Sequence, residues 1–87
     1  FIPNAFTPDG DKLNESFSVK GYGITQIDML IFDRWGEKIW EGHQLDDSWD
    51  GTYKGKLVEN DVYVYKIKVR DVFKKWHDYI GKVNVIR

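Results

Sequence analysis

The residue types best suited to chemistry stand near the start of the chain, where oxygen-bearing side chains are crowded. Four of them fall within seven positions: Asp9, Asp11, Asn14 and Glu15. Because calcium takes roughly six to eight oxygen ligands from carboxylates, amides and carbonyls, this segment is a candidate calcium site. It departs from the EF-hand loop, since Leu13 and Lys20 stand where that loop uses acidic ligands. A loop closed by Asx-turns, with Leu13 and Phe17 in the core, is the alternative.

A second group of residues has the composition of a catalytic triad: His43, Asp46, Asp47 and Ser48. Neighbouring positions on one loop do not easily align a base, an orienting group and a nucleophile, so we expect no catalysis from them. The chain has no cysteine and two histidines. That content excludes disulfides, thiolate metal sites and cysteine nucleophiles, and a zinc site would need carboxylates to complete it. We expect a protein that is not an enzyme and has no cofactor besides the candidate calcium ion.

Aromatic residues make up 16% of the chain. The tryptophans are Trp35, Trp40, Trp49 and Trp76. Exposed on a β-sheet, such rings could stack on sugars, which makes a carbohydrate-binding module one interpretation of the sequence. The alternative is that a short chain without disulfides uses these rings to fill its core. Trp49, directly before the Asp50-Gly51 turn, fits the second role.

The formal net charge of −1 hides an asymmetry along the chain. Residues 1–50 hold ten acids and four bases, net −6, whereas residues 51–87 hold four acids and nine bases, net +5. The overall balance argues against a dedicated nucleic-acid-binding protein. The excess of bases in the second part nevertheless directs attention to the strands that carry them.

Residues 62–70, with the sequence VYVYKIKVR, alternate in a way that predicts a half-buried strand. If this strand pairs with residues 76–86 through a turn at 71–75, four bases share the outward face: Lys66, Lys68, Arg70 and Lys82. Such a surface is suited to docking on an acidic partner or on an anionic membrane surface. Solubility and protection of a sheet edge are the alternative explanation.

Two further segments have strand patterns. Residues 27–35 (IDMLIFDRW) are apolar on both parities in their middle, as expected of a central strand covered on both faces. Residues 76–86 alternate again, and Gly81, where the parity changes, is a candidate β-bulge. Turn residues separate the apolar runs, and no segment has a helical period. We therefore predict an all-β fold, an immunoglobulin-like antiparallel β-sandwich of about seven short strands, with a small barrel as the alternative.

The length of the chain fits one domain, so residues 1–87 are assigned to a single domain. No run approaches the roughly 18 apolar residues of a membrane-spanning helix, and the start does not resemble a signal peptide. Since the chain begins at Phe1, we expect it to be a piece of a longer polypeptide that carries its targeting sequence elsewhere.

Several motifs, in order along the chain, resemble one known family. Residues 1–17 (FIPNAFTPDGDKLNESF) are similar to the FxPNxFTPNGDGxNDxF start of the gliding-motility-associated C-terminal domains. Residues 31–36 (IFDRWG) are similar to the IYNRWG motif of that family, and residues 49–53 (WDGTY) to its WDGTYNGK segment. Residues 62–65 (VYVY) and 81–87 (GKVNVIR) match its GVYVY strand and its GxVxxIR end. The chain thus resembles a type B C-terminal sorting domain of the type IX secretion system over essentially its whole length.

The resemblance implies a non-catalytic sorting signal at the C-terminus of a large secreted or cell-surface protein. It implies two partners, the outer-membrane translocon of the type IX secretion system and the upstream cargo domains of the same chain. Nucleic acid is not among the expected partners, and membrane contact is expected only through partners. The protein would be transiently periplasmic before it reaches the cell surface or the medium. A calcium-stabilised adhesive or structural sandwich is the alternative, beside the carbohydrate-binding module.

We expect the docking surface to be the last hairpin, because a terminal signal must be accessible at the terminus. It combines the four outward bases with Arg87, and the Arg34-Trp35 turn is the nearest alternative. The chain departs from the family pattern in the acidic segment, where Asp9 replaces Asn, Lys12 replaces Gly and Glu15 replaces Asp. Oxygen ligands therefore remain at two of these positions, whereas the third gains a positive charge.

Overall fold

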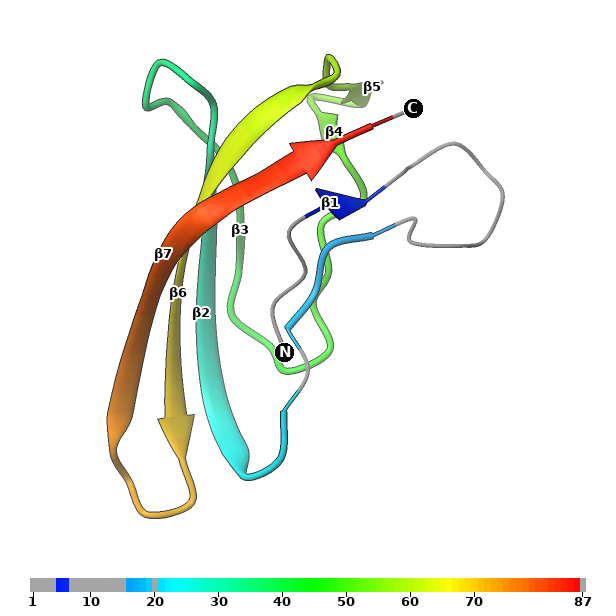
Figure 1. Cartoon of the computed structure of the whole chain (residues 1–87). Helices are drawn as coiled ribbons and strands as arrows, with labels where there is room; N and C mark the ends of the chain where they lie inside the picture. Colours follow the sequence, from blue (N-terminus) through cyan, green and yellow to red (C-terminus); the bar gives the residue numbers. More distant parts are fainter. Residues whose placement is uncertain (1–4, 7–15, 20, 87) are drawn as a thin grey trace.

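The computed structural model describes residues 5–6, 16–19 and 21–86, and within them the chain forms strands and no helix. The strands are β1 (Ala5–Phe6), β2 (Ile24–Phe32), β3 (Lys38–Gly42), β4 (Thr52–Tyr53), β5 (Lys56–Leu57), β6 (Asp61–Asp71) and β7 (Trp76–Val85). Figure 1 shows β2, β6 and β7 as long, curved neighbours that form the frame of the molecule. In the part of the chain that is described, no helix is long and apolar enough to span a membrane.

Five strands form one sheet in the order β1-β7-β6-β2-β3. β6 pairs antiparallel with β7 on one side and with β2 on the other, and β3 pairs antiparallel with β2. β1 differs because it runs parallel to β7, pairing Ala5 with Asn84 and Phe6 with Val85. β4 and β5 form a separate antiparallel hairpin. The sheet therefore ends on one side at short β3 and on the other at shorter β1.

One face of the sheet carries the hydrophobic core. In β2 the alternate residues Ile27, Met29 and Ile31 are buried, because successive side chains of a strand point to opposite faces. β6 and β7 contribute by the same alternation. The remaining members of the core are Phe17, Trp49, Tyr63, Ile67, Val69, Val83 and Val85. Each long strand thus buries one side in the core, and its other side forms the opposite face of the sheet.

The described residues that cover this core form a layer with little regular structure. Phe17 and Trp49, both fully buried, bond their backbones to each other with N···O distances of 2.7 and 2.8 Å. The indole Nε1 of Trp49 donates to the carbonyl of Thr52 at 3.0 Å. The Trp49 ring also meets the Tyr63 ring edge-on, with 5.5 Å between centroids. Large aromatic side chains therefore join the layer to the sheet, which is what a short chain without disulfides needs.

The all-β class is confirmed, and the arrangement is consistent with an immunoglobulin-like sandwich. The predicted strand at 62–70 is confirmed as β6, and the turn at 71–75 leads into β7 as expected. Two features differ from a regular antiparallel sandwich. β1 is parallel to its neighbour, and β1, β4 and β5 have two residues each.

The central strand differs from the prediction for residues 27–35. β2 begins at Ile24 and ends at Phe32, because Asp33 closes a turn that contains Trp35. Its core side is buried, whereas Asp28 and Leu30 on the opposite side are half-buried. β2 is therefore central within the sheet, as expected, but fully buried on one face rather than on both.

Gly81 does not form the expected bulge. β6 and β7 stay in register through the Tyr65–Gly81 pair. A Cβ added at Gly81 would lie 2.3 Å from the hydroxyl oxygen of Tyr65 and 2.5 Å from its Cζ. The Tyr65 ring also packs against the Phe17 ring in a tilted arrangement, with 5.6 Å between ring centroids. The glycine is needed because this ring crosses the backbone of the neighbouring strand, a close approach that a side chain would block.

Candidate docking surfaces

The face of the sheet opposite the core, which we call the outer face, carries the four bases predicted for docking. Its alternating residues are Gln26, Asp28, Leu30 and Phe32 of β2, Val62, Val64, Lys66, Lys68 and Arg70 of β6, and Trp76, Asp78, Ile80 and Lys82 of β7. The three lysines are exposed and Arg70 is half-buried. The structure therefore brings the predicted bases together on one surface.

Aromatic rings support three of these bases. The ammonium group of Lys66 lies 5.3 Å from the centroid of the Phe32 ring. Lys68 and Arg70 both lie over Trp76, at 5.3 and 5.9 Å from its centroid. Cations at such distances are attracted to the ring faces, and their aliphatic stems cover apolar surface. The side chains of these bases are therefore held along the sheet instead of extending freely into water.

Acidic side chains are interspersed with the bases. The register places Lys68 between Asp28 of β2 and Asp78 of β7. Glu41 of β3 stands opposite Leu30 at the margin of the same face. A shallow groove of about 480 Å³ follows this surface, with Leu30, Ile80, Lys66, Lys68, Asp28, Asp78 and His43 among its lining residues. The outer face is therefore mixed in charge with apolar positions between the charges, and the bases alone do not describe it.

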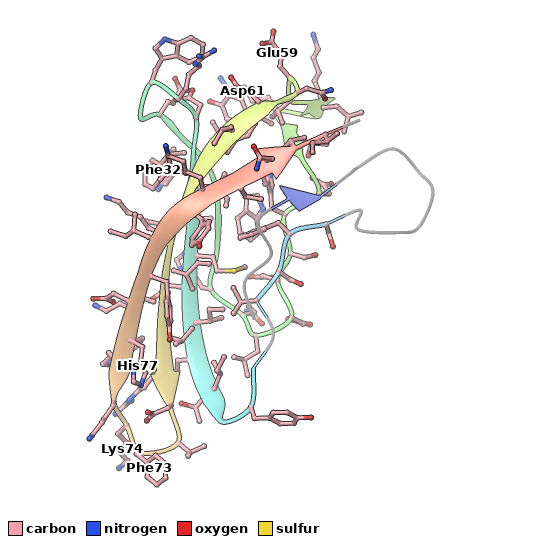
Figure 2. All side chains as sticks on the ribbon, in the orientation of Figure 1. Phe32, Glu59, Asp61, Phe73, Lys74 and His77 are labelled. Atoms are coloured by element: carbon pink, nitrogen blue, oxygen red, sulfur yellow. The ribbon has the colours of Figure 1, made fainter. Side chains whose placement is uncertain are left out.

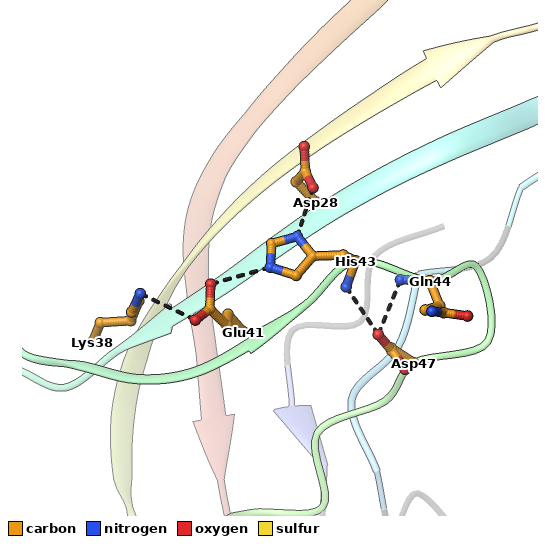
Figure 3. Close-up of polar contacts among 6 residues, drawn as sticks. All are labelled: Asp28, Lys38, Glu41, His43, Gln44 and Asp47. Atoms are coloured by element: carbon orange, nitrogen blue, oxygen red, sulfur yellow. Dashed lines mark hydrogen bonds and ion pairs between the residues drawn. The ribbon is translucent and has the colours of Figure 1, made fainter.

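At the margin of the outer face, His43 links Asp28 of β2 to Glu41 of β3, as Figure 3 shows. Its Nδ1 lies 2.7 Å from Oδ1 of Asp28, and its Nε2 lies 3.1 Å from Oε2 of Glu41. The hydrogen bond to Asp28, followed by that to Glu41, raises the pKa of His43 above its ordinary value. The pKa of Glu41 is lowered by His43 and then by Lys38, whose Nζ lies 3.3 Å away. The three ionisable groups therefore favour a charged imidazole between two carboxylates.

The loop with triad composition closes a turn. Oδ2 of Asp47 accepts hydrogen bonds from the backbone N–H groups of His43 and Gln44, each at 2.9 Å. The His43 ring is directed to Asp28 and Glu41 instead (Figure 3). The acid that would orient a catalytic base thus caps the backbone, and the base is engaged by two other carboxylates. The imidazole of His43 and the carboxylate of Asp47 are therefore not paired with each other as a base and its orienting acid.

Arg34 and Trp35, the alternative docking residues, lie at the tip of the β2–β3 hairpin. Nη1 of Arg34 lies 3.3 Å from Oδ2 of Asp61, at the start of β6. Its guanidinium carbon lies 5.5 Å from the centroid of the Trp35 ring. The Trp35 side chain is 81% exposed, so a flat aromatic surface projects from this end of the sheet. This tip is a second candidate contact surface, separate from the outer face.

The four tryptophans have different environments. Trp49 is fully buried and Trp40 is half-buried against the core, as the packing interpretation expects. Trp35 and Trp76 are exposed, but Trp76 is covered by bases of β6. These two rings also stand at opposite ends of the long strands, since β7 begins at Trp76 and the β2–β3 turn adjoins the far end of β2. They do not form one stacking platform for a sugar.

An apolar patch at the β6–β7 tip was not predicted from the sequence. Val72 and Phe73 are 58% and 79% exposed, and Tyr22 nearby is fully exposed. Figure 2 shows Phe73 and Lys74 together at this end of the molecule. A groove of about 620 Å³ lies behind them, lined among others by Val19, Tyr22, Ile24, Val72, Phe73 and Tyr79. The available signal was the pair Val72-Phe73, two consecutive apolar residues inside a predicted turn.

Two sets of predicted site residues lie outside the described part of the chain. They are the candidate calcium ligands Asp9, Asp11, Asn14 and Glu15, and the C-terminal Arg87. Among the residues that are described, no three His, Asp or Glu side chains are grouped as metal ligands. The calcium site therefore stays a prediction from the sequence.

Comparison with curated proteins gave no match. Comparison with protein families gave a match to the CHU_C type IX secretion signal domain over residues 1–82. The matched residues include β1 to β6 and the first part of β7, and therefore most of the sheet and of its outer face. On this evidence of sequence and coverage, the chain belongs to the family of CHU_C type IX secretion signal domains.

Proposed function

We propose that the domain is a non-catalytic C-terminal sorting signal that directs an attached cargo protein through the outer-membrane translocon of the type IX secretion system. The cargo would pass through the periplasm and reach the cell surface or the medium. The observation that carries the proposal is the family match over residues 1–82. The non-catalytic part of the proposal agrees with the contacts of the His43 loop, where Asp47 closes a turn and the imidazole bonds to Asp28 and Glu41.

Within this function we propose that the outer face docks on the secretion machinery. Its bases are supported by aromatic rings, and Leu30 and Ile80 lie between them as apolar positions. A surface of mixed charge selects its partner by complementarity, because wrong partners bring like charges together. The exposed Trp35 tip, which lies away from these bases, is the alternative contact.

The sorting role is tested by fusing residues 1–87 to a periplasm-directed fluorescent protein in a bacterium that has type IX secretion. The fraction of fluorescence outside the cell is compared with that of a strain lacking the translocon. We expect export that depends on the translocon. Retention of a folded fusion in the periplasm of both strains would overturn the proposal.

The docking face is tested by reversing its four bases to Glu in the same fusion: Lys66, Lys68, Arg70 and Lys82. The matched control reverses four exposed bases that lie outside this set: Lys54, Lys56, Lys74 and Lys75. We expect the first set to lower export strongly and the control to leave it close to that of the parent, with both domains shown to be folded by circular dichroism. Equal export of both sets would contradict docking through the outer face, and loss of export on Trp35→Ser alone would move the contact to the β2–β3 tip.

A further inference from the structure

Among the described residues, the outer edge of β7 is only partly paired. β1 pairs with β7 at Asn84 and Val85, and within the described residues the rest of β7 pairs with β6 alone. Residues 76–80 are exposed at every position. An uncovered strand edge presents backbone N–H and C=O groups to which another strand can bond. Within the described part of the chain, the stretch of β7 before Asn84 therefore has a free edge to which a strand can be added.

The register determines which backbone groups face this edge. The N–H of Asp71 donates to the carbonyl of Lys75 at 2.9 Å, so these residues form a hydrogen-bonded pair. In an antiparallel ladder such pairs recur at every second residue, and β6 and β7 remain in register throughout. The odd-numbered residues of β7, from His77 onward, therefore bond to β6. The even-numbered residues direct their N–H and C=O groups outward, and they include Trp76, Asp78, Ile80 and Lys82.

The side chains along this edge follow an order that is complementary to its own reverse. Ile80 is 71% exposed, and exposed Asp78 and Lys82 stand two residues before and after it. All three side chains lie on the outer face. Among the described residues, neither the Asp78 carboxylate nor the Lys82 ammonium group has a salt-bridge partner. An apolar residue thus stands between one negative and one positive charge, each without an ionic partner in the described part.

We propose that this edge pairs with the same edge of a second copy of the chain, antiparallel and centred on Ile80. Ile80 then faces Ile80 of the other copy, and Asp78 of each copy faces Lys82 of the other. All three pairs join residues whose backbone groups point outward, so each can exchange two hydrogen bonds. Opposite charges and apolar residues directly across from each other are the favourable cross-strand pairs.

Other registers are less favourable. Centring the pair on Asp78 or on Lys82 places two like charges opposite each other, which is destabilising. Centring it on Tyr79 places Asp78 opposite Ile80 and leaves both charges unmatched. The self-complementary order of Asp78, Ile80 and Lys82 therefore selects one two-fold arrangement, and it is this order that favours a second copy over an unrelated strand.

The geometry also limits the interface. β1 occupies the edge from Asn84 onward, so the shared ladder runs from residue 78 to residue 82. An interface of this length falls below the standard size for stable complexes, so we expect a weak dimer that forms as concentration rises. The other edge, β3, is less suited because it has five residues, a register shift at Phe32, and charges on Lys38 and Glu41 that already pair. In the proposed dimer both outer faces lie on the same side of one continuous sheet.

Disulfide trapping tests the register directly, because the chain has no cysteine of its own. Residues in a hydrogen-bonded antiparallel pair have Cα atoms about 5.5 Å apart, within the range for a disulfide. We expect the Ile80→Cys variant to oxidise to a covalent dimer, and the Asp78→Cys variant alone to remain monomeric. A mixture of Asp78→Cys and Lys82→Cys should form the mixed disulfide. Equal cross-linking of Asp78→Cys with itself would overturn the proposed register.

Charge exchange tests the association without a covalent bond. The monomer–dimer equilibrium of the 87-residue chain is measured by sedimentation from micromolar to millimolar concentrations. We expect Asp78→Lys and Lys82→Asp each to weaken self-association by about tenfold or more, because each makes both cross-strand pairs like-charged. The two variants mixed together should form a heterodimer, because they restore both opposite-charge pairs. Lys56→Asp, an exposed position on the separate β4–β5 hairpin, is the matched control and should associate like the parent.

The proposal is overturned by a parent chain that stays monomeric at all these concentrations, or by single charge variants that associate as the parent does. It is also overturned by a mixture of the two variants that stays monomeric. Because the readout is the association of the domain itself, a failure here leaves the export experiment unaffected. Conversely, loss of sorting activity would not bear on the dimer.

Discussion

The two hairpin tips, β2–β3 and β6–β7, lie at opposite ends of the sheet (Figure 1). They share the same pattern of backbone hydrogen bonds but differ in their side chains. At the β2–β3 tip, the N–H of Asp33 donates to the carbonyl of Glu37 at 2.9 Å, and Gly36 donates to the carbonyl of Asp33 at 3.1 Å. Oδ1 of Asp33 accepts from the N–H groups of Trp35 and Glu37, both at 2.9 Å. One aspartate therefore satisfies most of the polar groups of the turn.

The β6–β7 tip repeats this pattern. Asp71 donates to the carbonyl of Lys75 at 2.9 Å and accepts from the N–H of Lys74 at 3.0 Å. Its Oδ1 accepts from the N–H groups of Phe73 and Lys75, at 2.8 and 3.0 Å. Its Oδ2 has an additional partner, Nε2 of His77, at 2.9 Å. The second tip is thus built like the first, with one further link to the following strand.

The comparison shows which residues dictate the turn. The fourth position has a positive φ in both tips, 85° at Gly36 and 66° at Lys74. Glycine accepts this conformation without strain, whereas lysine does not. The aspartate network and the strand pairing therefore impose the conformation on Lys74. The third position, Trp35 or Phe73, is about four-fifths exposed in each tip, so neither aromatic ring is required by the packing of the core.

The largest effect on stability is expected from removing the aspartates. Asp33→Ala leaves two backbone N–H groups without their acceptor and should lower the free energy of unfolding by about 1–2 kcal/mol. Asp71→Ala should lower it further than Asp33→Ala, because the contact with His77 is lost as well. Urea denaturation of both variants measures the difference. The Asn variants keep a carbonyl acceptor and serve as controls, and an equal loss at both tips would contradict the role assigned to His77.

A smaller loss is expected from a side chain at the glycine of the first tip. Gly36→Lys gives this tip the residue type of the second, and the left-handed conformation should destabilise the domain by about 1 kcal/mol. No atom lies within 4 Å of a Cβ at this position, so the loss would come from the backbone and not from a clash. Gly36→Asn, which tolerates this conformation better, should lose less in the same denaturation experiment.

The reciprocal exchange should stabilise the domain. Lys74→Gly relieves the strained conformation, and part of this gain is offset by the greater freedom of glycine in the unfolded chain. We expect a net gain of about 0.5–1 kcal/mol in the free energy of unfolding. Lys75→Gly is the control, since Lys75 has no positive φ and gains nothing from glycine. A loss of stability in Lys74→Gly would show that the aspartate network removes the strain entirely.

The smallest expected effect is a dependence of stability on acidic pH that arises at the β6–β7 tip. His77, followed by the N–H of Lys75, lowers the pKa of Asp71 below its ordinary value of 3.8. A carboxylate with a lowered folded pKa stabilises the protein above its unfolded pKa, and this contribution disappears as pH falls through the folded pKa. We expect the difference in melting temperature between the parent and His77→Ala to shrink below about pH 3.8. A difference that is constant across this acidic range would show that the His77 contact contributes nothing through Asp71.

Local chemistry made parts of the fold predictable. The turn at 71–75 was expected from its position between alternating runs, and Asp71 closes it by hydrogen bonds within five residues. The alternation of β6 correctly placed Tyr63, Tyr65, Ile67 and Val69 toward the core and Lys66, Lys68 and Arg70 on the outer face. Such features depend on neighbours in the chain and on the two-residue period of a strand.

Other features needed the partner strand. Gly81 was predicted as a bulge, because the sequence does not show that the Tyr65 ring crosses the backbone there. The surface predicted to be positive is mixed in charge in the structure. Asp28 and Asp78 flank Lys68 because β2, β6 and β7 are paired in this register. Neither contact joins residues near each other in sequence, and a shift of one residue in register would place the acids on the other face.

By itself, the sequence determined the all-β class, the alternation of β6, the position of the turn at 71–75 and the family to which the chain belongs. Only the tertiary structure decided which tryptophans are buried, which charges border the bases, and which part of the β7 edge β1 covers among the described residues. The physical reason is the range of the interactions. Turns and alternation follow from the covalent geometry of adjacent residues, whereas burial, charge pairing and open edges follow from the register and order of strands that are distant in the chain.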